Sequence, residues 1–246
     1  MTLTHLISPT TTSSAHSVRV LRQNNATQLT VRLANDKKTK QDCYKLRYLS
    51  YFSEGHIEPR RSEKFSDEYD DRPDVQTVVI YKGDCAVAST RVCLLTRGLD
   101  GSASGSIPAQ HVFPDEIEDL FGRDAPAPVR RVVEINRLVR HPEFAEDKSL
   151  VFLLFRLAGH FILKHDAGAV VSCVRRNHVP FYTRLRFSEV AGPRTYHGVK
   201  FSTHLLSCLR EQYDTVRRMV PVLDVSGAER ERYDRLSQGQ TVTVLP

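Results

Sequence analysis

The rest of the chain is predicted to fold around one strand, Arg130-Arg131-Val132-Val133-Glu134-Ile135-Asn136-Arg137-Leu138-Val139-Arg140-His141-Pro142. Its aliphatic and β-branched residues are typical of a strand, and the final proline ends the run. Glu134, Asn136 and Arg137 lie in its middle, where a purely structural strand has little use for polar side chains. Period-two alternation places Glu134 and Asn136 on one face and Arg137 on the other, unless a bulge intervenes. The stretch therefore predicts either an edge-strand salt bridge or, as we favour, a charged site in a cleft.

The size and charge of the chain limit the classes of protein to consider. Its 246 residues are enough for one large domain with a real core, and the formal net charge is +6. A basic protein suits an acidic partner, so nucleic acid, an anionic membrane and an acidic carrier protein all remain open. No apolar run reaches the roughly 18 residues that span a bilayer, and the N-terminus lacks the apolar core of a signal peptide. We expect a soluble, cytoplasmic monomer with no integral membrane segment.

The cysteines and histidines give no sign of a metal site. The five cysteines are an odd number without a C-x-x-C pair, and each lies in an apolar context. This pattern predicts buried thiols in a reducing cytoplasm. The histidines His141, His160, His178 and His204 share no ligand spacing, so we assign no metal.

The order of predicted elements indicates a mixed α/β (α+β) fold. Residues 1–27 are rich in Ser, Thr and Asn and are expected to form a disordered arm, 28–220 one domain, and 221–246 a polar tail. Besides the strand quoted above, periodicity predicts strands at 28–34, 75–81, 85–95, 168–175, 187–191 and 199–206, and helices at 37–53, 112–121, 149–163, 177–186 and 209–220. This order combines a hairpin with a strand-helix-strand crossover, which predicts a mixed sheet with helices on both faces.

Several short motifs, in order, carry a resemblance to known enzymes. They are Leu46-Arg47-Tyr48-x-x-Tyr51, Asp67-x-Tyr69-Asp70, Ser89-Thr90-Arg91, Phe113 and Glu134-x-x-Arg137. Together they resemble the acyl-homoserine lactone synthase superfamily over roughly 29–206. The Leu-Arg-Tyr opening and Phe181-Tyr182-x-x-Leu185-x-Phe187 are more similar to its N-acyl amino acid synthases of the FeeM type. The chain has no tryptophan, and Phe65 replaces an acidic residue of the lactone synthases, which favours the amino-acid-acylating branch.

This resemblance implies an acetyltransferase-like (GNAT) fold, in which the sheet splays beside the central strand and a thioester arm enters the gap. Glu134 is the candidate general base; the alternative is an ion pair with Arg137, Arg91 or Arg131. Tyr182 would protonate the leaving thiolate, with core packing as the alternative. The catalytic candidates are Glu134, Arg137 and Tyr182. The substrate-binding candidates are Arg47, Tyr51, Asp67, Asp70, Arg91, Phe113, Leu138 and Val139.

For two groups of these candidates the expected contact with the substrates can be stated. Arg47, Arg91 and Arg137 would hold the acceptor's carboxylate or order the acidic loop at 56–73, because guanidinium pairs well with carboxylate. The backbone at Leu138 and Val139 would bind the thioester carbonyl.

The acyl donor is indicated by the segment before the long predicted helix. Relatives that use coenzyme A have a glycine-rich loop there that binds pyrophosphate. Residues 140–148 contain no glycine and three acids, so we expect no bound cofactor and a donor presented on the phosphopantetheine arm of acyl carrier protein. An acidic carrier would contact basic side chains. The candidates are Arg140, Lys148, Arg156, Arg175 and Arg176.

The sequence therefore predicts an N-acyltransferase that moves a long-chain fatty acyl group from acyl carrier protein to the α-amine of an amino acid, with tyrosine as one candidate. The alternative in chemistry is a lactone synthase that uses S-adenosylmethionine. Two alternatives of other functional classes are a basic nucleic-acid-binding module and a carrier-protein-binding module without catalysis. The positive residues are scattered rather than gathered on one recognition helix, so we expect no nucleic acid partner.

Overall fold

The computed structural model describes residues 28–122, 129–225 and 227–244. The expected N-terminal arm at 1–27 lies outside these residues. Within them one large sheet has the strand order β7-β8-β6-β5-β3-β2-β1-β9, and β4 pairs with β3 alone. The strands are β1 Leu29–Leu33, β2 Val75–Lys82, β3 Cys85–Arg97, β4 Ala103–Gly105, β5 Arg131–Arg140, β6 Ala169–Val174, β7 Ser188–Thr195, β8 Ser202–Leu209 and β9 Val242–Val244.

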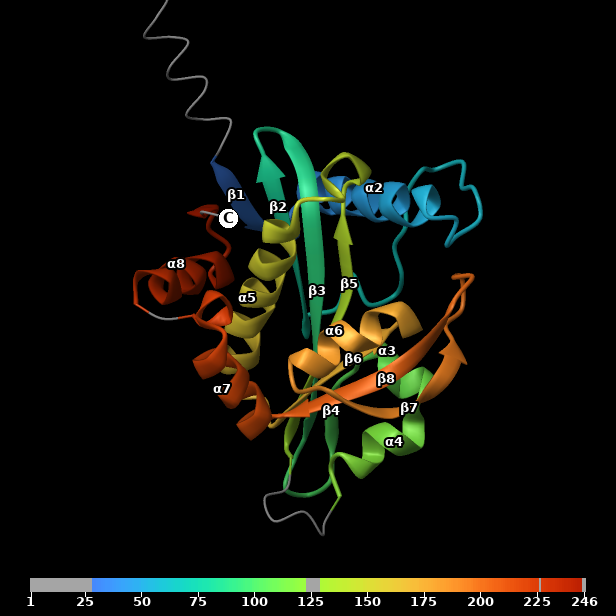
Figure 1. The fold of residues 1–246 in the computed structure, drawn as a ribbon, viewed down its shortest axis with the longest axis vertical. Coiled ribbons are helices and arrows are strands. Elements are labelled where there is room, and N and C mark those ends of the chain that lie inside the picture. The colour runs from blue at the N-terminus through green and yellow to red at the C-terminus, as the bar shows by residue number, and fades with distance from the viewer. Residues whose placement is uncertain (1–27, 123–128, 226, 245–246) are drawn as a thin grey trace, which may run out of the picture.

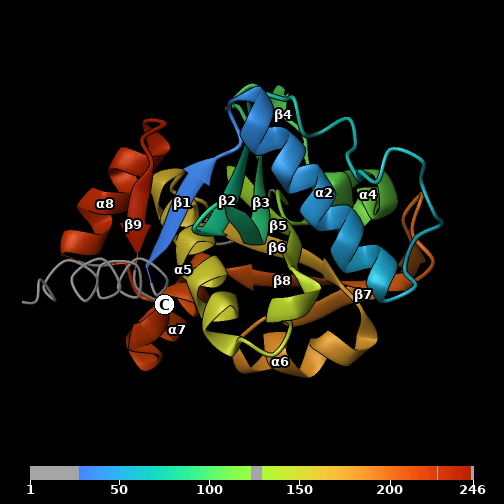
Figure 2. The same ribbon diagram turned by 90° about the horizontal axis from the view of Figure 1, so that it is seen from above.

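Helices cover both faces of this sheet (Figures 1 and 2). The helices are α2 Lys37–Ser53, α3 Pro108–Val112, α4 Pro114–Asp119, α5 Lys148–Lys164, α6 Val179–Arg184, α7 Arg210–Met219 and α8 Ala228–Ser237, with single 3₁₀ turns at Pro142–Phe144, Arg176–His178 and Pro221–Leu223. The apolar residues of α5 recur at spacings of three and four, and they pack with β1–β3, β5, α6 and α7 into the main core. A second core lies on the other face under α3 and α4. The predicted mixed sheet with helices on both faces is confirmed.

The central strand is β5, which has one antiparallel and one parallel neighbour. It pairs with β3 along most of its length, but with β6 only at Val132–Ala169, Val133–Val170 and Glu134–Val171. Beyond Glu134, β5 has no partner on that side, while β6 continues beside β8 as far as Val174. The ribbon shows the outcome, because β7 and β8 cross β5 at a large angle instead of running along it (Figure 1). The sheet therefore splays between β5 and β6.

Local sequence explains where the helices beside this opening begin and end. The carboxylate of Asp36 caps α2 by accepting a hydrogen bond from the Thr39 amide, 2.9 Å away. The helix ends at Ser53, and Gly55 adopts a positive φ of 70°, as a helix terminus often requires. Asp147 caps α5 in the same way through Ser149. The helix predicted at 112–121 corresponds to the shorter α4, and α3 before it was not predicted. Phe113 separates the two helices because its backbone is not helical, and each helix begins at a proline.

The predicted polar tail at 221–246 is wrong. Helix α8 packs beside α5, and β9 extends the sheet by pairing antiparallel with β1. Tyr233 and Leu236 of α8 are fully buried, and the two valines of β9 are buried as well. The domain therefore continues to Val244. Among the described residues, no helix is long and apolar enough to cross a membrane.

Replacing Leu236 by alanine tests whether the C-terminal segment belongs to the core. The side chain is fully buried, so Leu236→Ala should lower the free energy of unfolding by about 2–5 kcal/mol through lost burial and a residual cavity. Chemical denaturation measures the change. The matched control is Arg235→Ala, an exposed neighbour on the same helix, which should change it by no more than about 0.5 kcal/mol. Equal small effects for both variants would contradict this packing.

Candidate active site

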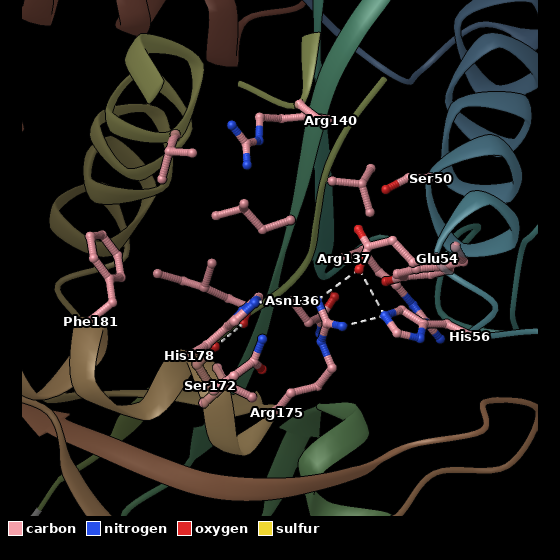
Figure 3. A pocket seen from close by; sticks show the side chains of 18 of the residues that line it. Ser50, Glu54, His56, Asn136, Arg137, Arg140, Ser172, Arg175, His178 and Phe181 are labelled. Atoms are coloured by element: carbon pink, nitrogen blue, oxygen red, sulfur yellow. Dashed lines mark hydrogen bonds and ion pairs between the residues drawn. The ribbon is translucent and has the colours of Figure 1, made fainter. Parts of the chain in front are cut away.

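A cavity of about 550 Å³ lies at the splay between β5 and β6 (Figure 3). Helix α2 borders it through its last turn, α5 through its first turns, and α6 through Phe181 and Tyr182. One part of its wall is apolar, formed by Ile135, Leu138, Val139, Val151, Phe152, Phe155, Phe181 and Tyr182. The polar part includes Ser50, Glu54, His56, Asn136, Arg137, Ser172, Arg175, Asn177 and His178. The cavity thus offers an apolar chamber and a charged end within one enclosure.

A bulge in β5 places Arg137 at this cavity. Arg137 has a positive φ of 50°, and the register with β3 shifts between the pairs Arg91–Asn136 and Ser89–Val139. Strict alternation would point Arg137 away from Asn136, yet both side chains line the cavity. Strand β5 therefore contains the bulge that the sequence analysis named as the possible exception to strict alternation. It also brings Leu138 and Val139 into the cavity wall, as expected for them.

Three arginines and two aspartates form a mostly buried network next to the cavity. Asp70 accepts hydrogen bonds from Arg47 Nη1 at 2.7 Å and Arg91 Nη1 at 3.0 Å. Asp67 accepts from Arg91 Nη2 at 3.0 Å and from Arg137 Nη2 at 2.7 Å. Burial opposes ionisation of Asp67, but Arg91 and Arg137 outweigh it and hold its pKa well below the usual range. The aspartates thus tie the 56–73 loop to α2, β3 and β5.

This network decides which arginines are accessible to a ligand. Arg47 and Arg91 are almost fully buried and do not line the cavity. Of the two predicted roles, holding the acceptor's carboxylate and ordering the acidic loop, their position fits the second. Arg137 binds Asp67 and also lines the cavity, with Tyr51 beside it. Phe113 was expected to bind substrate, and that expectation is wrong. It is buried under α3 and α4, where Arg194 lies over its ring.

Glu134 does not face the cavity. One carboxylate oxygen accepts the Ala109 amide at 2.7 Å and the other accepts Asn136 Nδ2 at 3.0 Å, so it bridges β5 to α3. Burial raises the pKa of Glu134, although these two hydrogen bonds oppose the shift. Both interpretations from the sequence are therefore wrong in geometry: the carboxylate is not exposed in the cleft, and among the described residues its hydrogen-bond partners are amides and not an arginine. It reaches the cavity wall only through Asn136.

Tyr182 lies at the gap between the two strands. Its side chain is buried and lines the cavity, and its hydroxyl is 3.4 Å from Ser172 Oγ. Ser172 in turn donates to the carbonyl of Ile135, 2.8 Å away, which is the first carbonyl beyond the last β5–β6 pair. Burial raises the pKa of Tyr182 to about 12, so the phenol keeps its proton at neutral pH. Ser172 was not singled out from the sequence, although a polar residue inside an apolar strand is a usable signal.

A polar cluster at one end of the cavity was also missed. Arg175 Nη2 is 3.0 Å from Glu54 Oε2 and 3.3 Å from His178 Nε2, and Arg175 Nη1 contacts His56. Figure 3 shows these side chains converging from α2 and from the turn after β6. Glu54 and Arg175 are 121 positions apart in sequence, so no local motif could have joined them.

The residues expected to bind a carrier protein are divided by the structure. Arg140 and Lys148 line the cavity near the start of α5, and Arg176 is exposed. Arg156 lies elsewhere: it is mostly buried and pairs with Glu229 at 3.2 Å, which contradicts a place on a carrier-facing surface. Among the described residues, no three His, Cys, Asp or Glu side chains are grouped so that they could hold a metal.

Several solved structures share this architecture. FeeM, an N-acyl amino acid synthase from uncultured soil microbes, superposes with a TM-score of 0.61 and 12% identity over 80% of this chain and 98% of that one. The coenzyme-A-dependent acyl-homoserine lactone synthase BjaI has a TM-score of 0.52 and 15% identity over 82% and 92%. For the lactone synthase LasI the values are 0.51 and 18% over 73% and 88%. The fold is that of the GNAT-like acyltransferases, as the resemblance implied.

Sequence comparison narrows the class further. Residues 42–208 match the family described as N-acyl amino acid synthase FeeM. The chain therefore belongs to this family and is an acyltransferase. No curated protein matches the chain significantly.

The Asp70→Asn variant tests the role of the arginine network. Asp70→Asn removes the charge that Arg47 and Arg91 share, so it should lower the free energy of unfolding by about 3–5 kcal/mol, because it leaves buried guanidinium groups undercompensated. Denaturant titration measures this loss. Asp71→Asn is the matched control, since Asp71 is exposed and pairs only with Lys40 among the described residues; it should cost no more than about 1 kcal/mol. Comparable losses at both positions would disprove the assigned role.

Proposed function

We propose that this protein transfers a long-chain fatty acyl group from the thioester of acyl carrier protein to the α-amine of a free amino acid. The observation that carries the proposal is the cavity at the β5–β6 splay, with an apolar chamber beside a charged end. The aromatic and aliphatic wall from α5 and α6 suits a fatty chain, which is stabilised by burial of its methylene groups. The charged end suits a zwitterionic acceptor.

Attack by the amine requires the acyl carbon to lie beside the free edge of β5. There the neutral amine nitrogen forms a bond to the acyl carbon and the carbon–sulfur bond breaks. The leaving thiolate takes up a proton from a donor at the gap, and the proton that the nitrogen loses passes to solvent water, from which the donor is reprotonated. Tyr182 is the candidate proton donor at that position, because its neutral phenol lines the gap. Glu134 has a positioning role in this scheme, since its hydrogen bond orients Asn136 in the wall.

The beginning of α5 supports a carrier protein as the source of the acyl group. A coenzyme A pyrophosphate would need the free amides and positive dipole of a helix N-terminus. Here the Asp147 carboxylate accepts hydrogen bonds from the amide and the hydroxyl of Ser149, at 3.0 and 2.6 Å, so that an acid already occupies this end. Arg140 and Lys148 lie at the cavity nearby and could attract the phosphate and the acidic surface of a carrier.

The proposal is tested by incubating the protein with acyl-loaded carrier protein and each amino acid separately, with tyrosine among the first. Mass spectrometry should detect an N-acyl amino acid from at least one of them. A parallel reaction contains S-adenosylmethionine instead of the amino acid. Release of methylthioadenosine with an acyl-lactone would establish the alternative chemistry. Failure of every amino acid to yield an amide would refute the proposal.

Removing the hydroxyl of Tyr182 distinguishes proton donation from core packing. If the phenol protonates the leaving thiolate, Tyr182→Phe should lower kcat by about 100-fold with little change in the KM of either substrate. Tyr196→Phe is the matched control, because Tyr196 itself is not part of the cavity lining and its hydroxyl contacts the thiol of Cys173. An unchanged kcat for Tyr182→Phe would leave packing against Phe155 and Phe187 as its role.

A further inference from the structure

We propose that Arg175 binds the α-carboxylate of the acceptor, at the place that the Glu54 carboxylate occupies in this structure. This inference rests on the proposed function, because it assigns the acceptor's position in the same cavity. It replaces the expectation that Arg175 contacts a carrier protein.

The Arg175 guanidinium is held in place before any ligand arrives. Its Cζ lies 5.6 Å from the centre of the Phe201 ring, and it contacts the imidazoles of His56 and His178. His56 itself packs against the Phe201 ring, with the ring centres 4.9 Å apart. Imidazole rings and an aromatic face position the guanidinium without supplying negative charge. Glu54 is therefore the group in this cluster that supplies negative charge.

Glu54 is also the member of the cluster most easily displaced. Its side chain is 50% exposed, against 24% for Arg175 and 18% for His56. It follows the last residue of α2 and also contacts His56 Nε2 at 2.8 Å, and its carboxylate can move into solvent when a ligand carboxylate takes over its place beside Arg175. The ion pair shows that a carboxylate fits this guanidinium, and an exposed pair of this kind contributes little to stability. A ligand carboxylate can thus take its place at small cost.

The other arginines near the cavity are less suitable. Arg47 and Arg91 are buried in the network with Asp67 and Asp70, and Arg137 is bound to Asp67. Arg140 donates to the carbonyl of Asp147 and lies at the opposite end of the cavity from Arg175 (Figure 3). Arg175 is thus the guanidinium whose acidic partner is exposed and exchangeable.

The position of Arg175, directly after the last residue of β6, also suits the reaction. Ser172, Cys173, Val174 and Arg175 line the cavity in succession, which connects the gap at Tyr182 with the charged end. In an α-amino acid the amine is one carbon away from the carboxylate. With the carboxylate on Arg175, the amine can face along β6 toward the acyl carbon at the gap. The same contact would select free α-amino acids over simple amines.

Binding of two reaction-product analogues tests this inference without turnover. N-dodecanoylglycine contains the part that all N-acyl amino acids share, and N-methyldodecanamide is the same molecule without the carboxylate. Isothermal titration calorimetry below the micelle concentration should show that the wild-type protein binds the acid at least about tenfold more tightly, because a charge-assisted hydrogen bond is worth more than one factor of ten. Arg175→Gln should abolish this preference and leave the affinity for the amide unchanged.

Three further variants keep the result interpretable. Glu54→Gln removes the competing carboxylate and should tighten binding of the acid severalfold, with no effect on the amide. Arg184→Gln, on the exposed side of α6 and outside the cavity lining, should behave as the wild type. Arg175→Lys keeps the charge but not the forked donors and should restore part of the preference.

The outcomes separate this inference from the proposed function. No wild-type preference for the acid, a preference retained in Arg175→Gln, or weaker acid binding in Glu54→Gln would each overturn it. Failure of the wild-type protein to bind either compound would overturn it as well. If amino acids are acylated in the separate transfer assay while any of these results is found, the carboxylate site alone is wrong.

Discussion

The short parallel pairing between β5 and β6 is the constraint on which the rest of the structure depends. After Glu134 the two strands separate, and the polar backbone groups of β5 must find other partners or pay a desolvation penalty. The hydroxyl of Ser172 donates a hydrogen bond to the carbonyl of Ile135. The bulge at Arg137 turns the following residues toward the cavity between the two strands. Both features stabilise the separation, so the opening at the cavity is built into the sheet itself.

The charges around the cavity follow from how the acids and the arginines are matched. Asp67 and Asp70 are shared among Arg47, Arg91 and Arg137, so two carboxylates serve three guanidinium groups. At the charged end of the cavity Arg175 is balanced by the exposed Glu54. The net formal charge of the network is therefore positive on the side where Arg137 lines the cavity. An electrostatic field of this sign favours anionic groups there.

Sequence patterns were sufficient for the fold and for part of the site. Alternation and helical spacing located β1, β2, β3, β5, α2 and α5, and the ordered Arg, Asp and Tyr motifs located the network and Tyr182. Orientation was not accessible, because a hydrogen bond to the distant Ala109 amide turns Glu134 toward α3. The cluster of Glu54, His56 and Arg175 depends on chain segments that meet only in the folded protein. Beyond residue 220, scattered apolar residues such as Tyr233 and Leu236 were too few to show periodicity, although they are fully buried.

The C-terminal strand β9 has a consequence for the exposed edge of the sheet. It pairs with β1 from Leu29 to Val31, covering an edge whose residues alternate between buried and half-buried. An uncovered edge of this kind is a template for intermolecular strand pairing, whereas a very short edge strand offers few free donors and acceptors. Strand β9 therefore covers the edge of the sheet at β1, and its packing beside α8 holds it there.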